Sequence, residues 1–230
     1  VQLRHTQAAD WFNQVSINVL HASRAPNSVV VASWVTDGKG RALMFQGVSQ
    51  SWPEIAARTE ISTPATDQPT MFALSPDGQQ IVFVASGDGA SRLWLRSLAT
   101  TTAQPLAGTE GAIYPFWSPD SRSVGFFSGQ ALKRIDLGGG APQTLAPGIG
   151  GRGGTWSADG VILFAPSAAG PLSRVPAGGG DVVPVTTLGA GQTGHRFPQF
   201  LPGGRQFLYY AAGSAETAGI YLGALDAAAV

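Results

Sequence analysis

The chain has 230 residues, of which 12% are charged, and its 14 lysines and arginines balance 14 aspartates and glutamates. Because the charge is balanced, no basic face is expected, and nucleic acid is excluded as a partner. Cysteine is absent and glycine is abundant, at 31 residues, which excludes disulfides and thiolate metal sites and is typical of short strands joined by tight turns.

Residues 1–57 contain short apolar segments that predict strands. Val15–Leu20 alternates apolar and polar residues, Val29–Trp34 is mostly apolar, and the turn signal Asp37-Gly38 follows. This turn stands 40 residues before Asp77-Gly78. The segment is therefore either a degenerate first copy of the repeat that begins near residue 58, or an unrelated leader that happens to contain a turn.

From residue 58 onward one short motif recurs: a bulky residue, a polar tight turn and then an apolar run. The turn positions fall at residues 77, 120, 159 and 203, a spacing of about forty residues. Proline pre-sets φ at the second position of such a turn, aspartate accepts backbone N–H groups, and glycine adopts positive φ. The four copies are Leu74–Gly78, Trp117–Ser121, Trp156–Gly160 and an altered copy, Phe200–Gly204.

Each copy continues into further short strands, which gives a repeat of up to four antiparallel strands. Four strands in about forty residues are typical of one blade of a β-propeller. The predicted fold is all-β, a propeller of four to five four-stranded blades, either complete or an incomplete part of a larger ring. Residues 58–230 form the repeat region, with blades predicted at 71–107, 113–146, 154–188 and 197–226, the last with three strands.

Residues at equivalent blade positions are predicted to have equivalent structural roles. The turn aspartates Asp77, Asp120 and Asp159 are predicted to cap their turns, and the alternative is that they are ligands or acids lining a site. The capping role is favoured because the fourth copy has Gly203 at this position. Recurring aromatic residues are predicted to form the core between blades: Phe83, Trp94, Trp117, Phe126, Trp156 and Phe164.

Residues 58–226 resemble the TolB-type β-propeller repeat. The shared features are, in order, a Ser-Pro-Asp-Gly turn, an apolar strand, a strand segment with a leucine at each end, and a pair of glycines. Four strings are similar to the propeller region that follows the kinase domain and membrane anchor in many bacterial serine/threonine protein kinases. They are Ala103–Gly111, Tyr114–Ser121, Arg152–Trp156 and His195–Pro202. The resemblance implies an extracytoplasmic domain, periplasmic or at the cell surface.

The chain itself carries no kinase motif. A Gly-rich loop with Val-Ala-Ile-Lys, a His-Arg-Asp loop and Asp-Phe-Gly are all absent from the sequence, so we expect neither kinase activity nor nucleotide affinity. No apolar run approaches the ~18–20 residues that cross a bilayer, and no signal-peptide pattern is present. If the parent protein is membrane-anchored, its anchor is therefore expected outside this sequence.

The candidate ligand site is the axial mouth of the propeller. In a propeller, the connections that enter the inner strands open on the face where the central channel widens, and polar groups that converge there can hold a small ligand. The alternative is that Arg152 and His195 bond loop carbonyl groups of neighbouring blades. The candidate ligand-binding residues are Glu110, Tyr114, Arg152, His195 and Arg196.

No catalytic residue, cofactor or metal site is predicted. The sequence has no G-x-S-x-G elbow, H-E-x-x-H motif, P-loop or EF-hand loop. Gly148–Gly153 matches G-x-G-x-x-G, but it precedes a strand instead of opening a helix, which predicts a loop. The three histidines, His5, His21 and His195, are too scattered to predict a metal cluster.

Two functions follow from these observations. The first is a non-catalytic module that senses a small ligand or binds a protein partner, like the extracytoplasmic part of a kinase receptor. The second is a propeller-type hydrolase or lyase, such as a metal-assisted lactonase, with an axial site. The fold alone does not separate them, because sites are grafted onto folds.

A further expectation concerns ring closure. The last blade ends after three strands, and an open strand edge favours aggregation. Val15–Leu20 has the alternation of an outer strand and is predicted to complete the last blade, giving five blades closed by both chain ends. The alternative is an open four-blade arc to which residues 1–57 are loosely attached.

Overall fold

The computed structural model describes the backbone of residues 17–20, 30–36 and 42–48, and both backbone and side chains of residues 64, 66, 68, 71–87 and 89–226. This described part contains strands and no helix, so the predicted all-β class is confirmed, and no helix in it could span a membrane. The strands are β1 (Ile17–Leu20), β2 (Val30–Thr36), β3 (Ala42–Val48), β4 (Phe72–Leu74), β5 (Gln80–Ala85), β6 (Arg92–Ser97), β7 (Ala103–Pro105), β8 (Ile113–Trp117), β9 (Ser123–Ser128), β10 (Ala131–Asp136), β11 (Gln143–Pro147), β12 (Gly154–Trp156), β13 (Val161–Phe164), β14 (Ser173–Pro176), β15 (Val183–Pro184), β16 (Gln192–Phe200), β17 (Gln206–Gly213) and β18 (Gly219–Ala224).

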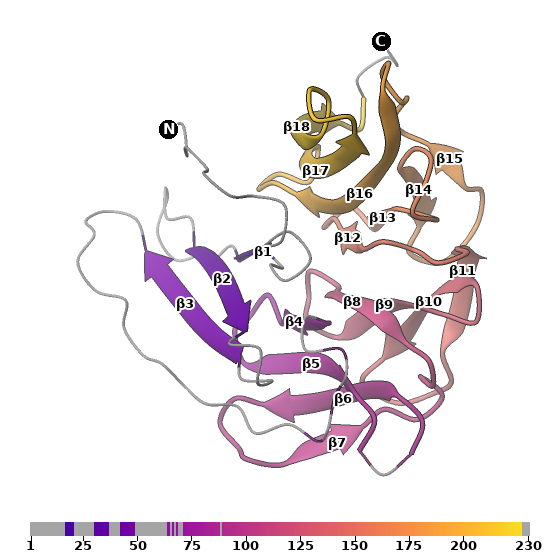
Figure 1. The fold of residues 1–230 in the computed structure, drawn as a ribbon. Coiled ribbons are helices and arrows are strands. Elements are labelled where there is room, and N and C mark those ends of the chain that lie inside the picture. The colour runs from indigo at the N-terminus through magenta and orange to yellow at the C-terminus, as the bar shows by residue number, and fades with distance from the viewer. Residues whose placement is uncertain are drawn as a thin grey trace.

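The strands form separate antiparallel sheets that follow one another along the chain. Their orders are β1-β2-β3, β4-β5-β6-β7, β8-β9-β10-β11, β12-β13-β14-β15 and β16-β17-β18. Figure 1 shows the sheets fanned around a common centre, with β8, β12 and β16 toward it and β7, β11 and β15 at the rim. Each inner strand contacts the inner strand of the next sheet: β4 contacts β8, β8 contacts β12, and β12 contacts β16. The fold is thus a β-propeller, and the predicted blades correspond to the last four sheets.

The first two of the repeated turns are closed by a serine–aspartate pair. The Ser75 hydroxyl donates to the Asp77 carboxylate at 2.5 Å and accepts the backbone N–H of Gln80 at 2.8 Å. Ser118 and Asp120 repeat the pair at 2.6 Å, and this hydrogen bond lowers the pKa of the Asp120 carboxyl. The serine therefore holds both the turn and the first residue of the next strand.

The turns of successive blades lie side by side on one face. The backbone N–H of Asp77 donates to the Ser121 hydroxyl of the next blade at 3.2 Å. A Cβ added at Gly204 would lie 3.2 Å from the Cβ of Ser157. Asp159 is exposed in the third of these turns. The repeat thus sets the position of each turn against its neighbour.

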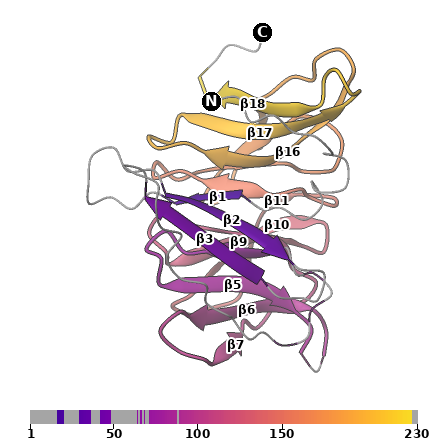
Figure 2. The ribbon, with the colours of Figure 1, turned by 60° about the vertical axis from the view of Figure 1, so that its left-hand side comes forward.

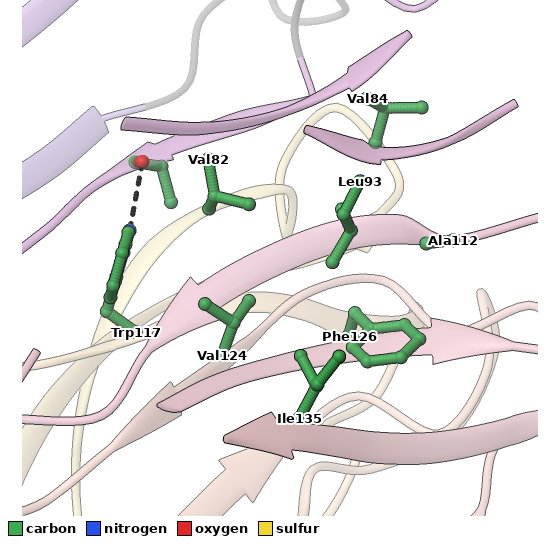
Figure 3. Close-up of a cluster of buried hydrophobic side chains, with 9 residues drawn as sticks. Val82, Val84, Leu93, Ala112, Trp117, Val124, Phe126 and Ile135 are labelled. Carbon is green, nitrogen blue, oxygen red and sulfur yellow. Dashed lines mark hydrogen bonds between the residues drawn. The ribbon is translucent and has the colours of Figure 1, made fainter. Parts of the chain in front are cut away.

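Apolar side chains fill the space between the sheet β4–β7 and the sheet β8–β11 (Figure 3). Trp117 ends β8 and donates its indole N–H to the carbonyl oxygen of Ala73 in β4 at 3.0 Å. This bond gives the buried indole its partner while the ring joins two blades. The other buried members of this interface are Val82, Val84, Leu93, Ala112, Val124, Phe126 and Ile135.

The next two interfaces are built in the same way. Phe116 fits against two glycines, and a Cβ added at Gly125 or Gly154 would lie 2.3 or 2.5 Å from its ring. Only glycine allows the ring to come this close to both strands. The second interface contains Phe127, Leu132, Ile162, Phe164 and Val175, and the third contains Leu163, Ala165, Leu172, Phe200 and Phe207.

The strand near the N-terminus does not complete the last blade, so the predicted partner of Val15–Leu20 is corrected. β1 pairs with β2, with Ile17 opposite Ser33, and the last sheet is β16-β17-β18. The connection between β1 and β2 is short, and closing a short loop costs less entropy than joining the two ends of the chain. The division of the chain at residue 57 stays a prediction.

Candidate functional site

The backbone is irregular at the start of the inner strand in three successive blades. Tyr114, Gly153 and Phe197 each lie three residues before the bulky residue of the turn motif, and their φ angles are 50°, 86° and 53°. The hydrogen-bond register shifts at this place in β8 and in β16. A bulge of this kind re-aims a side chain, and positive φ is unfavourable for tyrosine and phenylalanine. Such strain is concentrated at functional sites.

The two re-aimed aromatic side chains meet. The ring centroids of Tyr114 and Phe197 are 5.7 Å apart with an interplanar angle of 54°. Gly153 lies next to Phe197, since a Cβ there would be 3.2 Å from the Phe197 Cα. Phe197 lies at the surface, where 45% of the residue is exposed to solvent. Three blades therefore contribute to one cluster.

Arg152 places a positive charge beside the Tyr114 ring and bonds Phe197 through its backbone. Its guanidinium carbon lies 5.7 Å from the centroid of the Tyr114 ring, within cation–π range. Its Nη1 donates to the carbonyl oxygens of Gly150 and Gly151 at 2.6 and 3.0 Å, and its own carbonyl accepts the N–H of Phe197 at 2.8 Å. We call Tyr114, Arg152 and Phe197 the Tyr114 cluster.

His195 is a buried and hydrogen-bonded residue. It is 1% exposed, and its ring lies 4.6 Å from the ring of Tyr209. Its Nε2 bonds the Gln192 Oε1 at 2.9 Å and its Nδ1 bonds the Thr186 hydroxyl at 2.8 Å. Because the Gln192 Oε1 is an acceptor and also accepts the N–H of Gly189, Nε2 is the donor in its bond. Burial lowers the pKa of His195, which favours the neutral ring.

The other two candidate residues have different partners. The Glu110 carboxylate lies 3.7 Å from the Arg92 guanidinium, and its backbone carbonyl accepts the Ser128 hydroxyl at 2.6 Å. Arg196 donates from Nε to the carbonyl oxygen of Ala168 at 2.9 Å. The structure thus brings Tyr114 and Arg152 into contact, and it gives Glu110, His195 and Arg196 separate hydrogen-bonded positions.

Phe197 is the functional candidate that the sequence analysis did not select. A signal for it was present, because Tyr114-Pro115 and Phe197-Pro198 are aromatic–proline pairs at equivalent places of the repeat. Proline disfavours helical backbone in the residue before it, which is compatible with an irregular strand start. The pairing of the two rings across blades could not be read from this signal.

Within residues 71–87 and 89–226 and the few described residues before them, no group of three or more histidines, aspartates or glutamates is placed to hold a metal ion. The chemistry that the Tyr114 cluster offers is therefore that of two aromatic faces and one guanidinium. These groups bind planar, apolar or carboxylate-bearing surfaces.

The fold and this site define the class of protein: a β-propeller with an aromatic–guanidinium cluster where its inner strands begin. No protein-family model matches the chain, and no curated protein matches it. Among solved structures it is similar to a putative TolB from Agrobacterium tumefaciens, with a TM-score of 0.65 and 18% identity, over 86% of this chain and 73% of that chain. It is also similar to TolB from Acinetobacter baumannii, with a TM-score of 0.65 and 20% identity, over 86% of this chain and 49% of that chain.

A third similar structure is an oligogalacturonate lyase from Vibrio parahaemolyticus, with a TM-score of 0.56 and 12% identity, over 92% of this chain and 70% of that chain. At these identities the similarity shows the fold alone. The chain therefore has a TolB-like β-propeller fold, as the repeat predicted.

Proposed function

We propose that this chain is a non-catalytic recognition module that binds a small ligand or a segment of a protein partner at the Tyr114 cluster. The observation that carries this proposal is the pair of strained aromatic residues, with φ angles of 50° and 53°, that meet across two blades. Phe197 is 45% exposed, so its strained backbone adds little to the stability of the fold, whereas Tyr114 is half-buried and packs against the second interface. A strained aromatic residue at the surface is typical of a binding site.

The composition of the cluster indicates the kind of ligand. Two tilted rings offer apolar faces, and the adjacent guanidinium offers donors for a carboxylate or a carbonyl group. The three residues come from separate blades, so the affinity for a ligand that contacts all of them would depend on how these blades pack. A peptide segment or small molecule with an apolar group next to a carboxylate fits this chemistry.

The cellular context belongs to the same proposal. The strings Tyr114–Ser121 and His195–Pro202, which resemble the propeller of bacterial serine/threonine kinase receptors, contain both aromatic residues of the cluster. The module would then act outside the cytoplasm and pass the presence of its ligand to a kinase domain. The coding sequence upstream of this chain tests the context: it should encode a kinase domain and a membrane anchor.

The binding function is tested by a thermal-shift screen of short peptides and small aromatic carboxylates. Compounds that raise the Tm of the native chain should fail to do so with the double variant Phe197→Gly and Arg152→Gln. Val183→Ser is the matched control, because Val183 is 42% exposed on the rim strand β15, away from the cluster. Equal shifts in the native and the double-variant chains would place binding elsewhere and contradict the proposal.

The alternative function is a propeller-type hydrolase or lyase with an axial, metal-assisted site. Its support is the fold similarity to a lyase, which concerns the fold alone. Such a site needs several carboxylate or imidazole ligands, and the described residues contain no such group of three. Tight binding of Mn²⁺ or Ca²⁺ in a calorimetric titration would favour this alternative.

A further inference from the structure

The last sheet, β16-β17-β18, has an apolar face without a counterpart among the described side chains. Ile220 and Leu222 in β18 are 59% and 60% exposed. They lie two residues apart in one strand and so point to the same side of the sheet. Leu208 of β17 lies opposite Leu222 and widens this face. Exposed apolar groups arranged in this way mark an interaction surface.

The repeat identifies what this face is, because equivalent positions exist in the three preceding blades. Ile220 lies opposite Tyr210 in the third and second strands of its sheet. At the equivalent place of the first and second four-stranded sheets, Leu93 lies opposite Val84 and Leu132 lies opposite Phe127. Leu172 holds the same position in the third blade, where its N–H donates to the Thr186 hydroxyl as the N–H of Leu93 donates to that of Thr109. Leu93, Leu132 and Leu172 are each 0% exposed.

Each of the three equivalent leucines is covered by strands of the following blade. Leu93 packs with Trp117, Val124 and Phe126, and Leu132 packs with Ile162 and Phe164. Leu172 packs with Phe200 and Phe207. The occupant is therefore always an antiparallel sheet that presents an aromatic or branched apolar side chain at these places. Figure 1 shows β16–β18 as the last described sheet of this series, with β12–β15 on its other side.

We propose that the face formed by Leu208, Ile220 and Leu222 is the docking surface for one further β-sheet of the same repeat, belonging to the same polypeptide in its parent protein. The interface continues the series of three inside this molecule. In Figure 2 the sheet β16–β18 lies at one end of the molecule, β5–β7 lie at the other, and β1–β3 lie between them. The docked sheet would lie beside β16–β18, on the side that faces away from β12–β15 in Figure 1.

Single cysteines measure whether the face is covered, since the native chain has no cysteine. Ile220→Cys should react rapidly with a thiol reagent in the 230-residue chain, whereas Leu172→Cys at the equivalent buried position should react slowly. A second copy of residues 113–147, the sheet that covers Leu93, is then appended after the C-terminus. The reaction at Ile220→Cys should slow at least tenfold, and the Tm of the chain should rise.

The control is the same appended copy with both Val124→Asp and Phe126→Asp, which should leave the reaction rate of Ile220→Cys unchanged. Three results would overturn the proposal. The first is an unchanged rate with the unmodified appended copy. The second is slow reaction in the 230-residue chain at all concentrations, which would mean that its own residues cover the face. The third is a rate that falls with protein concentration, which would assign the face to a second copy of the chain.

Discussion

The two ends of the inner strands follow different rules. At the end where the strand runs into its turn, a bulky apolar residue recurs, and in the first two copies hydrogen bonds of Ser75 with Asp77 and of Ser118 with Asp120 hold the turn closed. At the opposite end, the residue with positive φ is Tyr114, Gly153 or Phe197. Uniform and well-bonded positions stabilise the fold, whereas varied and strained positions are available for recognition.

The largest effect is expected at the turn end, from Trp117→Ala. This change removes a buried ring between two blades and should lower the free energy of unfolding by about 3–5 kcal/mol. Trp117→Phe keeps most of the packing but leaves the Ala73 carbonyl without the indole donor, and should cost about 1–2 kcal/mol. Urea melts check both values. A loss for Tyr114→Ala as large as that for Trp117→Ala would break the comparison.

Ser118→Ala should have an intermediate effect at the same end. The Ser118 hydroxyl is buried, donates to Asp120 and accepts the N–H of Ser123 at 2.9 Å. Its removal leaves a strand N–H without this partner and should cost about 1–2 kcal/mol. Because the lost hydrogen bond lowers the pKa of Asp120, NMR titration of the variant should find that pKa closer to its usual value. An unchanged pKa would contradict the role of the serine.

His195, near the opposite end, should make stability depend on pH. Burial lowers its pKa in the folded chain, so below the usual value of 6.5 the unfolded chain binds more protons than the folded chain. Stability is then complete above about pH 6.5 and declines as the pH falls toward the folded pKa. His195→Gln should flatten the Tm profile between pH 7.5 and 5, while Arg196→Gln should not. Equal slopes for native and His195→Gln chains would show that the ring is solvated.

The smallest effect on stability is expected for Phe197→Gly. Release of left-handed strain, about 1–2 kcal/mol for a non-glycine residue, is offset by glycine's greater unfolded-state freedom, about 0.5–1 kcal/mol, and by the lost contact with Tyr114. The free energy of unfolding should change by less than about 1 kcal/mol. A loss above about 2 kcal/mol in urea melts would show that Phe197 is core, and the two ends would then differ less than proposed.

The repeat of about forty residues, the turns and the all-β class could be read from the sequence. The reason is physical: a turn at Ser75–Gly78 is determined by residues within a few positions, and strand alternation is equally local. The burial of Trp117 and Phe126 followed from their recurrence at equivalent places. The sequence also placed Tyr114 and Arg152 at connections into inner strands, and their position at the axial mouth stays a prediction.

Only the tertiary structure decided which distant residues meet. The contact of Tyr114 with Phe197 depends on how blades pack, and neither residue's neighbours in sequence determine it. His195 was a candidate for the mouth, but three-dimensional packing encloses it between Thr186, Gln192 and Tyr209. The pairing of β1 with β2, and the difference between buried Leu172 and exposed Ile220 at one repeat position, likewise depend on what the folded chain places alongside each strand. Local chemistry sets the blade, and the packing of blade on blade sets the site.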